Sequence, residues 1–94
     1  MTAYVIGIRT KTTNADELKE YGRRAPEARL PGMKALARYG AFEVLEGPAI
    51  EGAVIIEFPS VEEAKAWYNS PKYQEIVKHR FAGAEYQMII IEGV

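Results

Sequence analysis

Residues 52–81 constrain the fold more than any other part of the sequence, because they combine an apolar strand pattern with two helix starts. Residues 53–58 are mostly β-branched or aromatic, and the run stops at Pro59. Such side chains favour strands, and the run is too short to be a helix. We therefore predict a strand that ends at the proline.

The two helix starts follow this strand directly. Ser60 stands three residues before Glu63, the spacing of a capping box, in which each side chain satisfies a free backbone N–H at the start of a helix. Ser70 and Pro71 repeat the signal, because proline cannot continue one helix but fits the first turn of the next. Apolar residues recur at helical spacing after both starts, so each helix should bury one face.

The remaining elements complete the order βαββαβ. Pro26 should kink the first helix, because it removes the hydrogen bond that would run back to Gly22. We predict a single α+β domain over residues 1–94, a ferredoxin-like four-stranded antiparallel sheet with its helices on one face. The predicted elements are a strand at 3–9, a helix that starts after Asn14 and ends by Pro31, an interrupted strand at 34–46 bent at Tyr39 and Gly40, a hairpin at Gly47 and Pro48, a strand at 52–58, helices after Ser60 and Ser70, and a strand at 86–92.

Both faces of the predicted sheet carry apolar side chains. In the last strand Met88 and Ile90 point to one side, and Ile89 and Ile91 point to the other. Two helices can cover only one face, and the second face would be a larger apolar patch than a monomer normally exposes. We predict that a second copy covers it in a two-fold homodimer; the alternative is a ligand pocket on that face of a monomer.

Composition narrows the function. Twelve basic and thirteen acidic residues give a net charge of −1, so neither nucleic acid nor an anionic membrane is an expected partner. The chain has one histidine and no cysteine, so we predict no metal site, and we find no motif for a cofactor. The first residues have no basic region and only a short apolar run, so we expect a cytoplasmic protein.

Several short motifs along the whole chain resemble one family. They are Ala3-Tyr-Val5, Arg38-x-Gly40, Glu43-Val-Leu-Glu-Gly47, Ile56-Glu-Phe-Pro-Ser60, Ala64 with Trp67-Tyr68, Ser70-Pro-x-Tyr-Gln74, Arg80 and Ile91-Glu-Gly93. Together they resemble DUF1330, an uncharacterised bacterial family of the dimeric α+β barrel superfamily. The resemblance implies a ferredoxin-like fold and a homodimer. Members often carry His-Gly-Gly before the second strand, where this chain has Pro31-Gly32-Met33, so a mechanism that uses that histidine is not expected.

Arg38 and Arg80 are the predicted substrate-binding residues. An arginine beside an apolar strand or at a helix end is placed to hold a carboxylate or phosphate through two parallel hydrogen bonds. The competing interpretation is that each arginine pairs with Glu43, Glu46 or Glu57 within the fold.

His79 and Tyr68 are the predicted catalytic residues. A neutral imidazole can act as a general base, and a phenol at the border of the sheet can reach a ligand. The competing interpretations are that His79 complements the dipole at the helix C-terminus and that Tyr68 packs in the core. Trp67 precedes Tyr68, so the two rings must point in different directions.

These observations predict a homodimer that binds or transforms a small organic molecule, for instance an anion, in a cleft between sheet and helices. Whether it is an enzyme stays open. One alternative is a non-enzymatic binding or assembly module. A further alternative comes from the superfamily, which includes cofactor-independent monooxygenases and haem-degrading enzymes that use an asparagine on the first strand with a tryptophan and a histidine. Trp67 and His79 match two of these, but residues 3–9 contain no asparagine.

Overall fold

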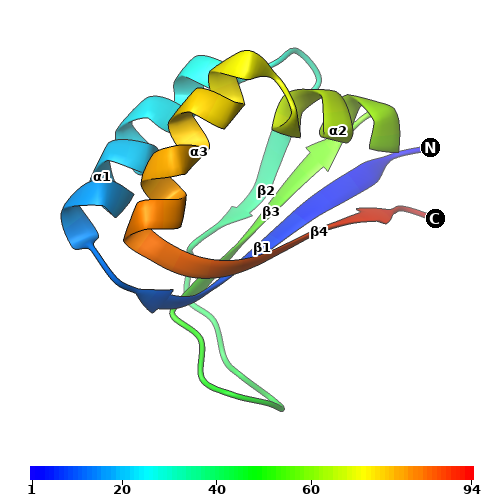
Figure 1. The fold of residues 1–94 in the computed structure, drawn as a ribbon. Coiled ribbons are helices and arrows are strands. Elements are labelled where there is room, and N and C mark those ends of the chain that lie inside the picture. Colours follow the sequence, from blue (N-terminus) through cyan, green and yellow to red (C-terminus); the bar gives the residue numbers. More distant parts are fainter.

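The four strands form one antiparallel sheet in the order β2-β3-β1-β4 (Figure 1). The computed structural model describes all residues from 1 to 94. The strands are β1 (Ala3–Thr12), β2 (Lys34–Arg38), β3 (Gly52–Phe58) and β4 (Ala84–Glu92). The predicted fold class is confirmed, although β1 and β4 are longer than the sequence pattern indicated.

All helices lie on one face of this sheet (Figure 1). They are α1 (Ala15–Arg24), the short 3-10 helix η1 (Ala25–Ala28), α2 (Val61–Tyr68) and α3 (Pro71–Gly83). The predicted caps are present: the side chains of Asn14, Ser60 and Ser70 each accept a hydrogen bond from a backbone N–H of the first turn. None of the helices combines the length and the apolar composition needed to cross a membrane.

Pro26 changes the type of helix rather than kinking it. The α-helix ends at Arg24, and the chain continues as the 3-10 turn of η1, with Pro26 in its first turn. Since proline has no N–H to bond to the carbonyl of Gly22, the tighter hydrogen-bond pattern replaces the α-helical one there.

The predicted strand at 34–46 is wrong beyond Arg38. Tyr39 has a φ of 51°, in the left-handed region, and turns the chain away from the sheet. Residues 40–50 contain no helix or strand, and we call them the arm. Two backbone hydrogen bonds hold its ends to the sheet, from Tyr39 N to Ala53 O and from Glu51 N to Arg9 O, each 2.8 Å.

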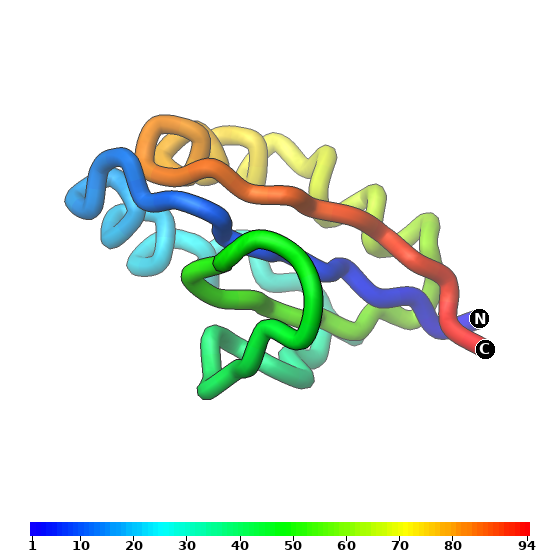
Figure 2. The backbone as a smooth tube through the Cα atoms, turned by 90° about the horizontal axis from the view of Figure 1, so that it is seen from below, coloured from blue at the N-terminus to red at the C-terminus, as the bar shows by residue number.

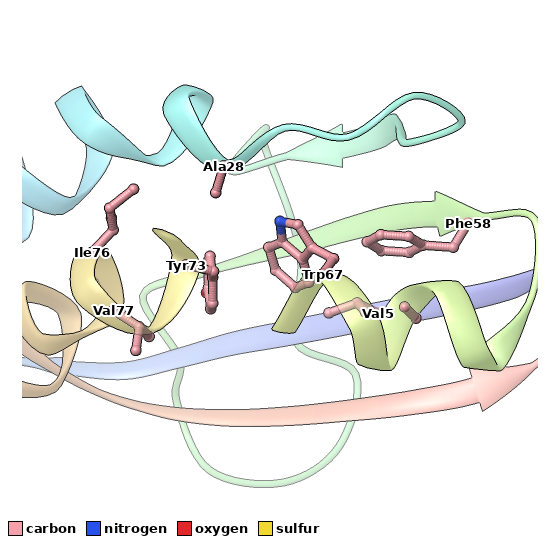
Figure 3. Packing of buried hydrophobic residues seen from close by; sticks show 8 residues of the cluster. Val5, Ala28, Phe58, Trp67, Tyr73, Ile76 and Val77 are labelled. Carbon is pink, nitrogen blue, oxygen red and sulfur yellow. The ribbon is translucent and has the colours of Figure 1, made fainter. Parts of the chain in front are cut away.

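The core lies between the sheet and the helices (Figure 3). Trp67 occupies its centre, between Phe58 and Tyr73, with its ring centroid 5.4 Å from that of Phe58 and 4.1 Å from that of Tyr73. The buried cluster consists of Val5, Ala28, Phe58, Ala64, Trp67, Tyr73, Ile76 and Val77. Trp67 is buried and Tyr68 is half-buried, so the two successive rings do point differently.

The sheet face away from the helices is apolar, as predicted. Ile6 of β1 lies directly between Ile55 of β3 and Ile89 of β4, which forms an isoleucine row across three strands. On the edge strand Ile89 is 46% exposed and Ile91 is 50% exposed. Figure 1 shows no helix on this side of the sheet. We call this surface the open face.

Candidate functional site

A cavity of about 430 Å³ lies between the helix-covered face of the sheet and helices α1 and η1. Pockets that hold small molecules are typically roughly 300–1,000 Å³. Ten of its sixteen lining residues are hydrophobic, and the charged ones are all arginines: Arg9, Arg29, Arg38 and Arg80. No acidic residue lines it, so a nearly neutral chain gathers positive charge at this one place.

The strand register explains why these cations share a site. Arg38, the last residue of β2, lies opposite the buried Val54, so both belong to the helix-covered side. Arg9 has the same strand parity as the buried Val5 and therefore also points toward the helices. Arg80 reaches the cavity from the last turn of α3. A sheet and a helix thus bring together residues that lie far apart in the sequence.

Arg80 is the most unusual of the four. Its side chain is buried, at 3% exposure, and no carboxylate lies within 4.0 Å of it. Aromatic rings surround the guanidinium: its central carbon is 4.7 Å from the ring centroid of Tyr86, 5.3 Å from that of Phe81 and 5.6 Å from that of Tyr21. The Nε and Nη2 atoms have no hydrogen-bond partner.

These two atoms form one edge of the guanidinium, the edge that can bind both oxygens of a carboxylate. A buried cation without an acidic partner is costly, and cation–π contacts offset only part of that cost. Arg80 is therefore a strong candidate for a group that meets an anion from outside the fold.

The other three arginines differ in their partners. Arg9 Nε lies 3.2 Å from a carboxylate oxygen of Glu51, although the two atoms are not aligned for a hydrogen bond. Arg29 donates a hydrogen bond from Nη2 to the carbonyl of Met33, at 3.4 Å. Arg38 is exposed and forms no ion pair. Of the four guanidinium groups, only that of Arg9 therefore has a carboxylate, that of Glu51, within 4.0 Å.

The competing interpretation of the two predicted arginines was pairing within the fold. The structure shows no ion pair from Arg38 or Arg80 to Glu43, Glu46 or Glu57. Both arginines line the same cavity, which is the geometry that their predicted role requires.

Three phenols add hydrogen-bonding groups to the cavity wall. The hydroxyl of Tyr39 lies 2.8 Å from that of Tyr86, and the hydroxyl of Tyr21 lies 2.7 Å from that of Tyr73. Burial raises the pKa of Tyr21, Tyr39 and Tyr73 above the ordinary range of a phenol, although the charge of Arg80 opposes the rise at Tyr21 and Tyr73. All three stay protonated at neutral pH. Tyr21 and Tyr39 line the cavity and can donate hydrogen bonds to an anion there, whereas Tyr73 is fully buried and does not line it.

His79 and Tyr68 lie outside this cavity. His79 Nδ1 is 2.7 Å from a carboxylate oxygen of Glu17, a contact that joins α3 to α1. Tyr68 lines a separate small apolar pocket beside β4, together with Met88 and Ile90. The structure therefore brings together the two predicted binding residues but not the two predicted catalytic residues, whose roles stay predictions.

Sequence reasoning missed Arg9, Arg29, Tyr21 and Tyr86. One signal was available for Arg9: its strand parity matches the core-facing residues of β1, where a charged side chain is unusual. No comparable signal marks Arg29, because nothing in the sequence brings it near Arg38. The structure contains no group of three or more histidine, cysteine or acidic residues that could hold a metal ion.

The sheet order and the placement of the helices define a ferredoxin-like α+β domain with a cationic cavity beneath its helices. The chain belongs to the DUF1330 family, a domain of unknown function whose model matches residues 2–94. A comparison with curated protein sequences found no match.

Solved structures share the fold. A protein of unknown function from Rhodopseudomonas palustris is 25% identical, with a TM-score of 0.74 over 99% of this chain and 82% of that one. A dimeric ferredoxin-like protein of unknown function from Thermobifida fusca is 15% identical, with a TM-score of 0.70 over 99% and 92% of the two chains. SnoaB, a cofactor-independent oxygenase from Streptomyces nogalater, is 9% identical, with a TM-score of 0.66 over 99% and 93%.

Proposed function

We propose that this protein is a homodimer that binds a small organic anion, with a carboxylate as its charged group, in the cavity between the sheet and the helices. The observation that carries the proposal is the charge of the cavity: four arginines line it, no acidic residue does, and Arg80 is buried without an acidic partner. An anionic ligand supplies the missing negative charge.

Arg38 and Arg80 contribute to binding in different ways. Arg38 is exposed and free of ion pairs, so it attracts the anion and can hold it through two hydrogen bonds. Arg80 supplies positive charge from a buried position, where the low dielectric constant strengthens its effect. Its Nε and Nη2 atoms are covered by neighbouring side chains, so direct contact with them needs a small shift of the guanidinium or of the Tyr86 ring.

The rest of the cavity favours a ligand with an apolar body. Most of its lining residues are hydrophobic, among them Met33, Ile56 and Met88. A site that combines arginines with a mostly apolar lining suits a carboxylic acid on an aromatic or aliphatic frame better than a neutral sugar. The protonated phenols of Tyr39, which follows β2, and of Tyr21, in α1, also line the cavity and can donate further hydrogen bonds to the charged end of the ligand.

The open face supports the proposed homodimer. The isoleucine row and Ile91 form an apolar surface that the helices of the same chain do not cover. A second copy placed sheet against sheet would bury it. Relatives of the same fold from Thermobifida fusca and Bacteroides fragilis are described as dimeric, which supports the same arrangement here.

A dimeric assembly module without a ligand is the second candidate function, and the same open face favours it. Oxygenase chemistry like that of SnoaB is not proposed. His79 is engaged with Glu17 outside the cavity, and β1 carries no asparagine. If the site does perform chemistry, the hydrogen-bonded phenols of Tyr39 and Tyr86, which both line the cavity, are candidate proton donors.

The test uses benzoate, phenylacetate and octanoate as probes, with benzamide as a neutral match for benzoate. We expect at least one carboxylate to bind by isothermal titration calorimetry, and its amide counterpart not to bind. Arg80→Met should weaken binding by roughly 30-fold or more, because removing one partner of a desolvated charge pair costs about 2–5 kcal/mol. Arg38→Met should weaken it by less, roughly two- to fivefold, because an exposed ion pair is worth about 0.2–1 kcal/mol.

Arg23→Met is the matched control, since Arg23 pairs with Glu20 on the surface of α1 and does not line the cavity. It should leave binding unchanged. Failure of every carboxylate to bind, or equal binding of benzoate and benzamide, would contradict the proposal. Loss of the dimer without an effect on binding in the two cavity variants would favour the assembly module.

A further inference from the structure

The arm, residues 40–50, is the part of the chain with the least internal structure. No hydrogen bond joins any of its backbone or side-chain groups to the rest of the protein; the nearest ones are those of Tyr39 and Glu51 at its two ends. A loop on a monomer surface leaves such groups to water. The composition of this arm does not suit that role.

The arm exposes several large apolar side chains. Phe42 is 50% exposed, Val44 is 39% exposed and Leu45 is 85% exposed. Phe42 and Val44 flank the polar Glu43, and such alternation of apolar and polar residues is the pattern of a strand. The pattern thus predicts a strand at 42–46 that finds no partner within its own chain.

The arm also points to the side where a second copy is expected. Figure 1 shows it extending from the sheet away from the helices, and Figure 2, which views the protein from below, shows it in front of the sheet. It therefore lies on the same side as the isoleucine row of the open face. A copy that packs against the open face would meet the arm.

The charges of the arm and of strand β2 support a second copy of this chain as the partner of the arm. The arm carries Glu43 and Glu46 and no basic residue. The edge strand β2 carries Lys34, which forms no ion pair and does not line the cavity, and its outer edge has no neighbouring strand. The same chain therefore offers an acidic segment with strand character and a basic, unpaired strand edge.

We infer that residues 42–46 of each chain become a β-strand by pairing with the sheet of the partner chain, so that the two arms clasp the homodimer. The inference rests on the homodimer proposed above. This pairing would give the backbone groups of the arm hydrogen-bond partners and bury Phe42 and Val44. It would also cover a strand edge that is otherwise open to further association.

The test measures amide hydrogen exchange in the arm and the strength of the dimer. In the dimer, amides within residues 42–46 should exchange at least about tenfold more slowly than unprotected amides, and dilution to the monomer should remove this protection. Val44→Pro removes a backbone donor and should weaken dimerisation by roughly tenfold or more relative to Val44→Ala, which keeps that donor. Circular dichroism should show both variants folded, because residue 44 makes no hydrogen bond within its own chain.

The outcomes separate this inference from the proposed dimer itself. Sedimentation that shows a dimer whose arm amides exchange freely would overturn the clasp and leave the homodimer standing. Equal dimerisation of Val44→Pro and Val44→Ala would do the same. Sedimentation that shows only monomers would overturn both.

Discussion

Replacing Arg80 with methionine should make the protein more stable while it weakens ligand binding. The substitution removes the guanidinium of a residue that is 3% exposed. This group has no acidic partner, and its Nε and Nη2 atoms have no hydrogen-bond partners. Methionine keeps much of the apolar stem of the side chain and adapts its shape to the space available. The prediction therefore opposes the usual expectation that changing a buried residue destabilises a fold.

The magnitude follows from two opposing terms. Each unsatisfied buried N–H group costs about 1–3 kcal/mol, so removing two of them gains roughly 2–6 kcal/mol. The variant also loses contacts with three aromatic rings at 4.7–5.6 Å, each worth up to about 2 kcal/mol at a desolvated site. It removes at the same time the cost of burying an unpaired charge, which is several kcal/mol per ion. The balance is a net stabilisation of about 1–3 kcal/mol.

Urea denaturation and thermal unfolding measure this effect, without any added carboxylate. For a domain of this size about 1 kcal/mol corresponds to a rise in Tm of about 4–8 °C. A loss of stability in Arg80→Met would show that the guanidinium holds the fold together, and the argument that it is reserved for a ligand would then fail. Arg23→Met serves again as the surface control.

Two further predictions concern the fold. Gly83→Ala should lower the free energy of unfolding by about 1–3 kcal/mol, because a Cβ there would lie 2.6 Å from the backbone nitrogen of Leu18. Gly22→Ala should raise the free energy of unfolding by about 0.5–1 kcal/mol, because a Cβ there would have no atom within 4 Å. Urea denaturation measures both effects. The raised pKa values of Tyr21 and Tyr39 mean that the fold prefers their neutral forms. The resulting stabilisation of the fold should be complete below pH about 10 and decline at higher pH. Tyrosinate absorbance measures the ionisation of the tyrosines, and a titration in which all of them ionise near pH 10 in the folded protein would contradict this prediction.

The local signals of the sequence predicted the fold well. The caps at Asn14, Ser60 and Ser70 depend only on residues within one helical turn, so they can be identified without knowing the tertiary structure. The arm could not be predicted in the same way. Whether an alternating run becomes a strand depends on a partner elsewhere, and the left-handed turn at Tyr39 leads this run away from its own sheet.

The site was only partly predictable, for a related reason. Arg38 and Arg80 were identified because each lies beside apolar residues at the end of an element, a property of the sequence alone. Arg9 and Tyr86 become part of the site only through the register that places them opposite each other in β1 and β4. His79 was selected as the single histidine, but its position on α3 directs it to Glu17 rather than to the cavity.

Sedimentation velocity at micromolar concentration is the decisive measurement, because the homodimer and the clasp of the arms both depend on a covered open face. We expect a single species with about twice the 10.5 kDa mass of the chain. A stable, well-folded species with the mass of one chain would contradict it, since the isoleucine row would then be exposed to water without a partner.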